Sequence, residues 1–134
     1  MKLTEKGPII APPLLDGWAE VVSLEIQSWP GIISATHWFL NDRTQVDGAD
    51  FYFGEKELGH IHLDGEIHLG LTRPLRKALT DAKLAEPFRW AQNWVQFPIT
   101  DQSSTQHAIW LFQLGYDRLK GTQFSELRRR IAQR

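Results

Sequence analysis

Hydrophobic and polar residues alternate regularly in the middle of the chain. Residues 58–70 read LGHIHLDGEIHLG, and the alternation continues on both sides of Asp64-Gly65. A period of two is typical of a strand with one buried face and one wet face. A three-residue turn, Leu63-Asp64-Gly65, with Gly65 in the left-handed region keeps the two halves in phase, whereas a two-residue Asp-Gly turn mixes them. We therefore predict the odd turn, which buries four aliphatic side chains together: Ile61, Leu63, Ile67 and Leu69.

The same phase gathers three of the five histidines on the polar face of this hairpin. His60 and His62 lie two residues apart on one strand, so their side chains point the same way. The three-residue turn places His68 nearly opposite His60 on the neighbouring strand. The pattern thus predicts one sheet face that carries three imidazoles.

A helical pattern precedes the hairpin. Apolar residues recur at spacings of three and four between residues 15 and 29, and Pro30-Gly31 then ends the predicted helix. Its buried face is predicted to hold Leu15, Trp18, Val22, Ile26 and Trp29. Residues 32–40 are rich in β-branched and aromatic side chains and residues 51–54 read FYFG, so we expect two strands around a polar loop at 41–50.

The second half of the chain favours helices. Four elements are predicted there: a helix at 72–84, a strand at 93–99, a helix at 101–119 and a last helix from Thr122 onward. The order of elements shows no βαβ alternation. We therefore predict an α+β fold with an antiparallel β-sheet of about five strands, helices packed mainly on one face, an N-terminal helix and two C-terminal helices.

Composition limits the classes of function. The length of 134 residues suits one domain, so residues 1–134 are expected to form a single domain with residues 1–13 as an extended N-terminal arm. A net charge of −1 provides no field to attract nucleic acid or an anionic membrane, and neither partner is expected. The absence of cysteine excludes disulfides and thiolate chemistry and fits a cytoplasmic location. No stretch is predicted to be a signal peptide or a membrane span.

Several motifs of common enzymes are absent. The chain has no G-x-S-x-G, no Gly-rich phosphate loop and no H-E-x-x-H. These absences disfavour a serine hydrolase, a nucleotide-binding enzyme and a zincin.

Four segments together resemble a known family. They are GEKELGHIHLDGEIHLGL (54–71), RPLRKAL (73–79), NWVQFPI (93–99) and AIWLFQLGYDRL (108–119). Over about residues 28–120 the chain resembles the luciferase-domain family, small bacterial proteins related to the fungal luciferases. The resemblance implies an α+β fold and a cofactor-free oxygenation of the kind that fungal luciferases perform on a hispidin-type pyrone. Relatives often have Pro-His where this chain has Pro87-Phe88, and the missing imidazole is expected near the other histidines.

The histidines are the candidate chemistry. We predict His60 and His62 as catalytic residues that act by proton transfer or by polarising an oxyanion. The predicted ligand-binding residues are His68, His37, Trp94, Tyr116 and Arg118. For Arg118 an ion pair with Asp50 or Asp117 that holds the fold is the alternative.

Two other interpretations of the histidines stay open. They could be hydrogen-bonded polar residues on a half-exposed sheet, or they could form a facial metal site. No metal ligand and no cofactor is predicted, because flat strands keep side chains parallel whereas ligands converge at about 2 Å from a metal.

The leading hypothesis is a small luciferase-domain-like protein that binds a flat aromatic or enolic small molecule at the hairpin face. If the protein is an enzyme, a cofactor-independent, oxygenase-like activity is expected. The alternative is a non-catalytic interaction module whose hairpin face and Arg128-Arg129-Arg130 contact a protein partner. The six tryptophans also leave a homodimer open. A pocket that encloses His60 and His62 favours the first hypothesis, and a flat face favours the second.

Overall fold

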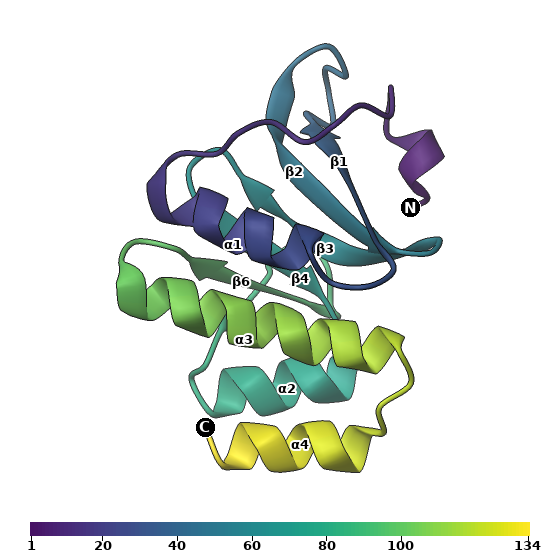
Figure 1. The fold of residues 1–134 in the computed structure, drawn as a ribbon. Coiled ribbons are helices and arrows are strands. Elements are labelled where there is room, and N and C mark those ends of the chain that lie inside the picture. The colour runs from purple at the N-terminus through teal and green to yellow at the C-terminus, as the bar shows by residue number, and fades with distance from the viewer.

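The computed structural model describes all 134 residues, which form one six-stranded antiparallel sheet and four α-helices (Figure 1). The strands are β1 (Ile32–Trp38), β2 (Val46–Phe53), β3 (Lys56–His62), β4 (Glu66–Gly70), β5 (Glu86–Pro87) and β6 (Trp94–Pro98). Their order across the sheet is β1-β2-β3-β4-β6-β5, and every neighbouring pair is antiparallel. The predicted α+β class is confirmed.

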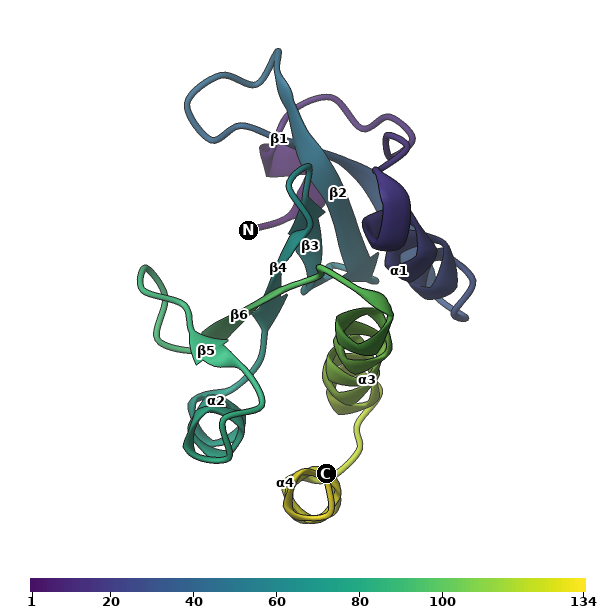
Figure 2. The ribbon, with the colours of Figure 1, turned by 90° about the vertical axis from the view of Figure 1, so that its left-hand side faces the viewer.

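The helices cover one face of this sheet. They are α1 (Gly17–Gln27), α2 (Arg73–Asp81), α3 (Gln102–Leu119) and α4 (Phe124–Ala132), with a 3₁₀ turn, η1 (Leu3–Glu5), near the N-terminus. Figure 2 shows α1 and α3 on the same side of the strands, with α2 next to β5 and β6 at the lower end of the sheet and α4 below α3. No helix combines the length and hydrophobicity that a membrane span requires.

The β3–β4 hairpin has the predicted register. His60 pairs with His68 across the two strands. The turn consists of residues 63–65, with Gly65 at a φ of +90°, and the Gly65 N–H donates to the His62 carbonyl over 2.9 Å. Glycine suits this position because its missing Cβ makes the left-handed conformation accessible. The three-residue turn is therefore confirmed.

Three of the four aliphatic side chains predicted to be buried in the hairpin are buried. Ile61, Ile67 and Leu69 have no exposed surface and belong to the hydrophobic core. Leu63 is 46% exposed, which corrects the prediction for this residue. The reason is local: Leu63 is the first residue of the turn and is no longer held against the core face of the sheet.

Two predicted elements differ in detail from the structure. In α1, Trp18 is 44% exposed and the small side chain of Ala19 is buried, so the buried face is rotated from the predicted one. Strand β2 begins at Val46 rather than Phe51, because residues 46–50 pair with β1 on one side and, from Gly48 on, with β3 on the other. The polar composition of this segment conceals its strand character.

The N-terminal segment packs along the sheet. The backbone N–H of Thr36 donates to the Ile10 carbonyl over 2.9 Å, and the Trp38 indole donates to the Pro8 carbonyl over 2.8 Å. The Tyr52 hydroxyl donates to the Met1 carbonyl over 2.6 Å. Side chains alternate between the two faces of a strand, so the side chain of Tyr52 points away from the core face of β2. Its contact with Met1 therefore places the start of the chain on the sheet face that the helices leave open.

Candidate functional site

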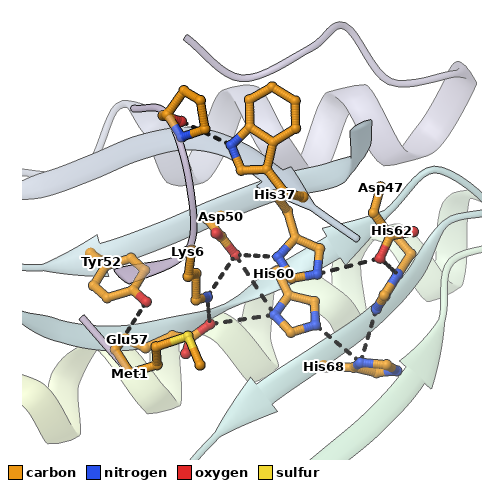
Figure 3. Close-up of polar contacts among 12 residues, drawn as sticks. Met1, Lys6, His37, Asp47, Asp50, Tyr52, Glu57, His60, His62 and His68 are labelled. Atoms are coloured by element: carbon orange, nitrogen blue, oxygen red, sulfur yellow. Dashed lines mark hydrogen bonds and ion pairs between the residues drawn. The ribbon is translucent and has the colours of Figure 1, made fainter. Parts of the chain in front are cut away.

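Four histidines from three strands meet on the open face of the sheet (Figure 3). His37 lies on β1, His60 and His62 on β3, and His68 on β4. Their side chains are between 12% and 22% exposed. The alternation of β3 sends His60 and His62 to the same side, and the hairpin register brings His68 beside them.

Gly48 lets the strands approach beneath this cluster. It pairs with His37 on one side and with His62 on the other. A Cβ at this position would lie 1.9 Å from the Ile61 carbonyl oxygen, and the φ of Gly48 is +158°. Only glycine therefore permits this close approach of β2 and β3.

A carboxylate stands behind each of the three hairpin histidines. Nδ1 of His62 lies 3.0 Å from Asp47, and Nε2 of His68 lies 2.8 Å from Glu66. Nδ1 of His60 lies 3.4 Å from Glu57. A carboxylate only accepts hydrogen bonds, so these contacts favour the tautomers in which the outer ring nitrogens carry the hydrogen.

The remaining nitrogens of the three rings point toward one another. Nδ1 of His68 lies 3.1 Å from Nε2 of His60 and 3.0 Å from Nε2 of His62. In the tautomers that the carboxylates favour, each of these three nitrogens presents a lone pair, and Nδ1 of His68 faces the other two.

His37 has a different environment. Its Nδ1 lies 2.8 Å from Asp50 and its Nε2 3.4 Å from Asp47. The ring stacks on that of His60, with centroids 4.0 Å apart and planes 11° apart. His37 therefore packs against the three hairpin histidines with both of its nitrogens next to carboxylates.

Asp50 is a fully buried acid beneath the histidines. Its Oδ1 lies 3.2 Å from the ammonium of Lys6, which also contacts Glu57. Its Oδ2 has no hydrogen-bond partner. Lys6 therefore ties the N-terminal segment to the acids of β2 and β3, and it is the cation that makes the burial of Asp50 tolerable.

Burial keeps two of the imidazoles neutral. It lowers the pKa of His60 well below its ordinary value, and the neighbouring histidines lower it further while Asp50 raises it. Burial also lowers the pKa of His68, although the hydrogen bond to Glu66 raises it in part. Near neutral pH both rings have a free lone pair and can accept a proton or bind a cation.

A pocket of about 450 Å³ lies over the cluster. All four histidines line it, together with aromatic and aliphatic residues: Trp38, Phe39, Leu40, Phe88, Ala91 and Trp94. Trp94 lies against His60 with centroids 5.7 Å apart, and Phe88 against His68 at 4.4 Å. The expectation that position 88 lies near the histidines is thus confirmed, and here an aromatic ring occupies the place of the imidazole.

The structure brings most of the predicted site residues together, but not all. His37, His60, His62, His68 and Trp94 line one pocket. Tyr116 lies elsewhere: it is buried, packs on Trp29 at 5.1 Å, and its hydroxyl donates to a backbone carbonyl at Pro30.

Arg118 also lies outside the pocket. Its Nε is buried without a hydrogen-bond partner. Neither acid named as its alternative partner pairs with it, because Asp50 contacts Lys6 and Asp117 contacts Arg130. The predicted ion pair of Arg118 is therefore absent.

The arginine run on the last helix is largely paired within the chain. Arg129 and Arg130 both contact Glu126, and Arg130 also contacts Asp117 over 2.6 Å. The alternative hypothesis of a protein-interaction module requires the three arginines to contact a partner. Two of the three guanidinium groups are already paired within the chain.

Sequence reasoning missed four of the charged residues that surround the imidazoles: Lys6, Asp47, Asp50 and Glu57. One signal was available in the chain. Asp50 stands between Ala49 and Phe51 in an apolar stretch, and a charge in such a stretch needs a partner.

Comparison with known proteins gives one match. Residues 55–115 match the family model described as Luciferase domain. The match confirms the resemblance to the luciferase-domain family, and the matched residues include His60, His62, His68 and Trp94. No curated protein and no solved structure matches the chain.

Proposed function

We propose that the luciferase-domain pocket binds a flat, weakly acidic small molecule, such as a phenol or an enol, and that His60 and His62 take its proton. The observation that carries this proposal is the position of two imidazole–carboxylate pairs at the base of an aromatic pocket. Neither feature alone indicates a ligand, but a concave apolar site with a few convergent polar groups is the usual form of a small-molecule site.

The shape and walls of the pocket favour a flat ring system. Its volume of about 450 Å³ lies within the range of about 300–1,000 Å³ that small-molecule sites occupy. Trp94 and Phe88 present aromatic rings beside His60 and His68. Aromatic walls bury a planar ligand at low cost in side-chain entropy, since each ring has only two rotatable bonds.

The imidazole–carboxylate pairs supply the chemistry. Nε2 of His62 accepts the proton of an acidic O–H, and Asp47, 3.0 Å from Nδ1, stabilises the imidazolium that forms. His60 and Glu57 offer a second, longer pair at 3.4 Å. The ligand anion then lies beside a cation in a pocket lined by apolar side chains, where their attraction is stronger than in solution.

Such an anion is electron-rich and is the form that reacts with dioxygen. In an oxygenase-like reaction a carbon of the enolate would bond to one oxygen atom, and dioxygen would be reduced to a bound peroxide. His37 and His68, which line the same pocket, would contact the oxygen atoms of the ligand.

A hydroxylated 2-pyrone is a direct probe, because its neutral and anionic forms absorb at different wavelengths. The probe is titrated with protein at a pH below its own pKa in solution. We expect saturable binding and a shift of the bound probe toward the anion. In His62→Gln we expect the probe to bind but the shift to be reduced, because the glutamine amide is not a base.

The matched control is His107→Gln, since His107 lies on α3 and contacts the Leu84 carbonyl rather than the pocket. Far-UV circular dichroism checks that each variant is folded. The proposal is wrong if no hydroxylated pyrone or phenol binds. The proton-transfer role is wrong if a His60→Gln/His62→Gln protein shifts the bound probe as far as His107→Gln does.

A further inference from the structure

We infer that His60, His62 and His68 form a binding site for a divalent transition-metal ion at the base of the pocket. The inference concerns the same pocket as the proposed function, but it rests only on the donor atoms of the chain. The Nε2 atoms of His60 and His62 cannot hold an ion and take a proton at the same time, so in the metal-bound form the ion, rather than these imidazoles, would hold the oxygen of a bound molecule.

The first observation is the spacing of the donor atoms. Nδ1 of His68 lies 3.1 Å from Nε2 of His60 and 3.0 Å from Nε2 of His62. Imidazole nitrogens bind Zn²⁺ at about 2.0–2.1 Å, so two nitrogens held 90–109° apart around one ion are about 2.8–3.4 Å from each other. Both separations that His68 makes lie in the range of neighbouring ligands of one ion.

The second observation is the direction of the lone pairs. Contacts with carboxylates favour the tautomers of His60, His62 and His68 in which the hydrogen lies on the nitrogen that faces away from the cluster. The three inner nitrogens therefore present lone pairs to one another. Three converging lone pairs repel unless a cation lies between them, and a metal ion satisfies all three at once.

The third observation is the outer layer of acids. Glu57, Asp47 and Glu66 each contact the outer nitrogen of one hairpin histidine, at 3.4, 3.0 and 2.8 Å. Metal-binding histidines almost always donate their second N–H to a carboxylate, a carbonyl or water, because this orients the ring and strengthens it as a donor. All three rings have such a partner here.

Charge points in the same direction. Four carboxylates surround the histidines, Asp47, Asp50, Glu57 and Glu66, and the cationic side chains beside them in the pocket are Lys6 and Arg43. This leaves an excess of negative charge, which a divalent cation would neutralise. Imidazole donors without thiolates select zinc, iron, cobalt or nickel rather than calcium or magnesium.

His68, and not His37, is the third ligand. His37 also lies within reach of His60 and His62, with donor atoms within 4.8 Å of theirs. However, both of its nitrogens are next to acids, Nδ1 at 2.8 Å from Asp50 and Nε2 at 3.4 Å from Asp47. Since the three hairpin histidines all line the pocket, the remaining positions of the ion would face the ligand.

Metal binding is tested on protein that carries no histidine tag and has been stripped with a chelator. Zn²⁺ is titrated against a chromophoric competitor, and Co²⁺ is added separately because its visible spectrum reports the coordination of the ion. We expect one ion per chain. Loss of an outer hydrogen bond costs about 10–100-fold in metal affinity. Because His68→Ala removes a ligand itself, it should weaken Zn²⁺ binding by more than this and should abolish the Co²⁺ bands. His107→Gln should bind like the unchanged protein.

A second variant covers the case in which His68→Ala does not fold. Glu66→Gln changes a partly exposed residue and keeps a side chain at the outer nitrogen of His68. We expect it to weaken Zn²⁺ binding about 10–100-fold. The inference is overturned if fewer than about 0.1 equivalents of Zn²⁺ bind, or if both variants bind Zn²⁺ as tightly as His107→Gln.

The metal site and the proposed function can fail separately. The pyrone probe is therefore also titrated into chelator-stripped protein. Probe binding together with failed Zn²⁺ binding removes the metal site and leaves the proposed function intact. Tight Zn²⁺ binding together with no probe binding, with or without Zn²⁺, removes the proposed function and leaves the metal site.

Discussion

Truncation of Ile67 to alanine tests the phase of the hairpin on which the histidine cluster depends. Ile67 is fully buried, pairs with Ile61 on β3 and with Phe97 on β6, and belongs to the core. Its neighbour His68 points to the opposite face, into the pocket. The same phase therefore determines how costly the truncation is and where His68 lies.

The magnitude follows from the atoms that are removed. Ile67→Ala deletes three carbon atoms, which at about 0.8 kcal/mol for each buried methylene gives a transfer loss of about 2.4 kcal/mol. The cavity left in a well-packed core adds to this, so we expect a loss of about 2–5 kcal/mol in the free energy of unfolding. Leu63→Ala at the exposed turn deletes as many carbon atoms, but 46% of Leu63 is already in water. We expect it to cost about 1 kcal/mol or less.

Urea denaturation followed by circular dichroism at pH 7.5 measures both losses. The unfolding slopes of the two variants must agree with that of the unchanged protein for the comparison to hold. Equal losses at positions 63 and 67 would refute the exposed position of Leu63 at the turn. A loss of about 1 kcal/mol or less for Ile67→Ala would refute the buried position of Ile67 and with it the phase of the hairpin. It would also remove the reason for His60, His62 and His68 to share a face.

Three further predictions follow from the geometry. In the presence of a chelator, we expect the free energy of unfolding to fall as the pH drops below 6.5. Burial lowers the pKa of His60 in the folded protein, so the unfolded chain takes up the proton first. Urea denaturation at pH 7.5 and 5.5 measures this fall, and equal stability at the two pH values would contradict it. Gly48→Ala strongly lowers the melting temperature, since its Cβ would lie 1.9 Å from the Ile61 carbonyl oxygen, whereas Gly54→Ala has nothing within 4 Å and costs only backbone strain. Tyr116→Phe loses a buried hydrogen bond worth about 0.5–1.5 kcal/mol; its binding of the pyrone probe is unchanged, and a large loss of binding would show that Tyr116 acts on the pocket.

The features that the sequence predicts well are local. The three-residue turn at 63–65 follows from a period-two pattern within thirteen residues, so no distant contact is needed to find it. The two-residue strand β5 has no pattern of its own, because it forms only by pairing with β6. The prediction for Trp18 is wrong because the helical period tolerates a rotation of one residue, and in the folded chain α1 buries the small Ala19 instead.

The candidate site divides in the same way. The face shared by His60 and His62 is a property of one strand and could be predicted. Two of the acids come from a different strand: Asp47 and Asp50 lie on β2 and reach the histidines only through the pairing of β2 with β1 and β3. Convergence of the ring nitrogens depends on side-chain torsions and on those acids, so no spacing along the chain could reveal it.

The first residues of the chain form one wall of the pocket. Met1 and Lys6 line it, and they are held to the sheet by the Tyr52 hydroxyl and by the acids of Asp50 and Glu57. An occupant that touches this wall and the docking of the segment must strengthen each other by the same free energy. Protection of residues 1–13 from amide exchange or from a protease is therefore a gauge of occupancy, and it can be read before the occupant is identified.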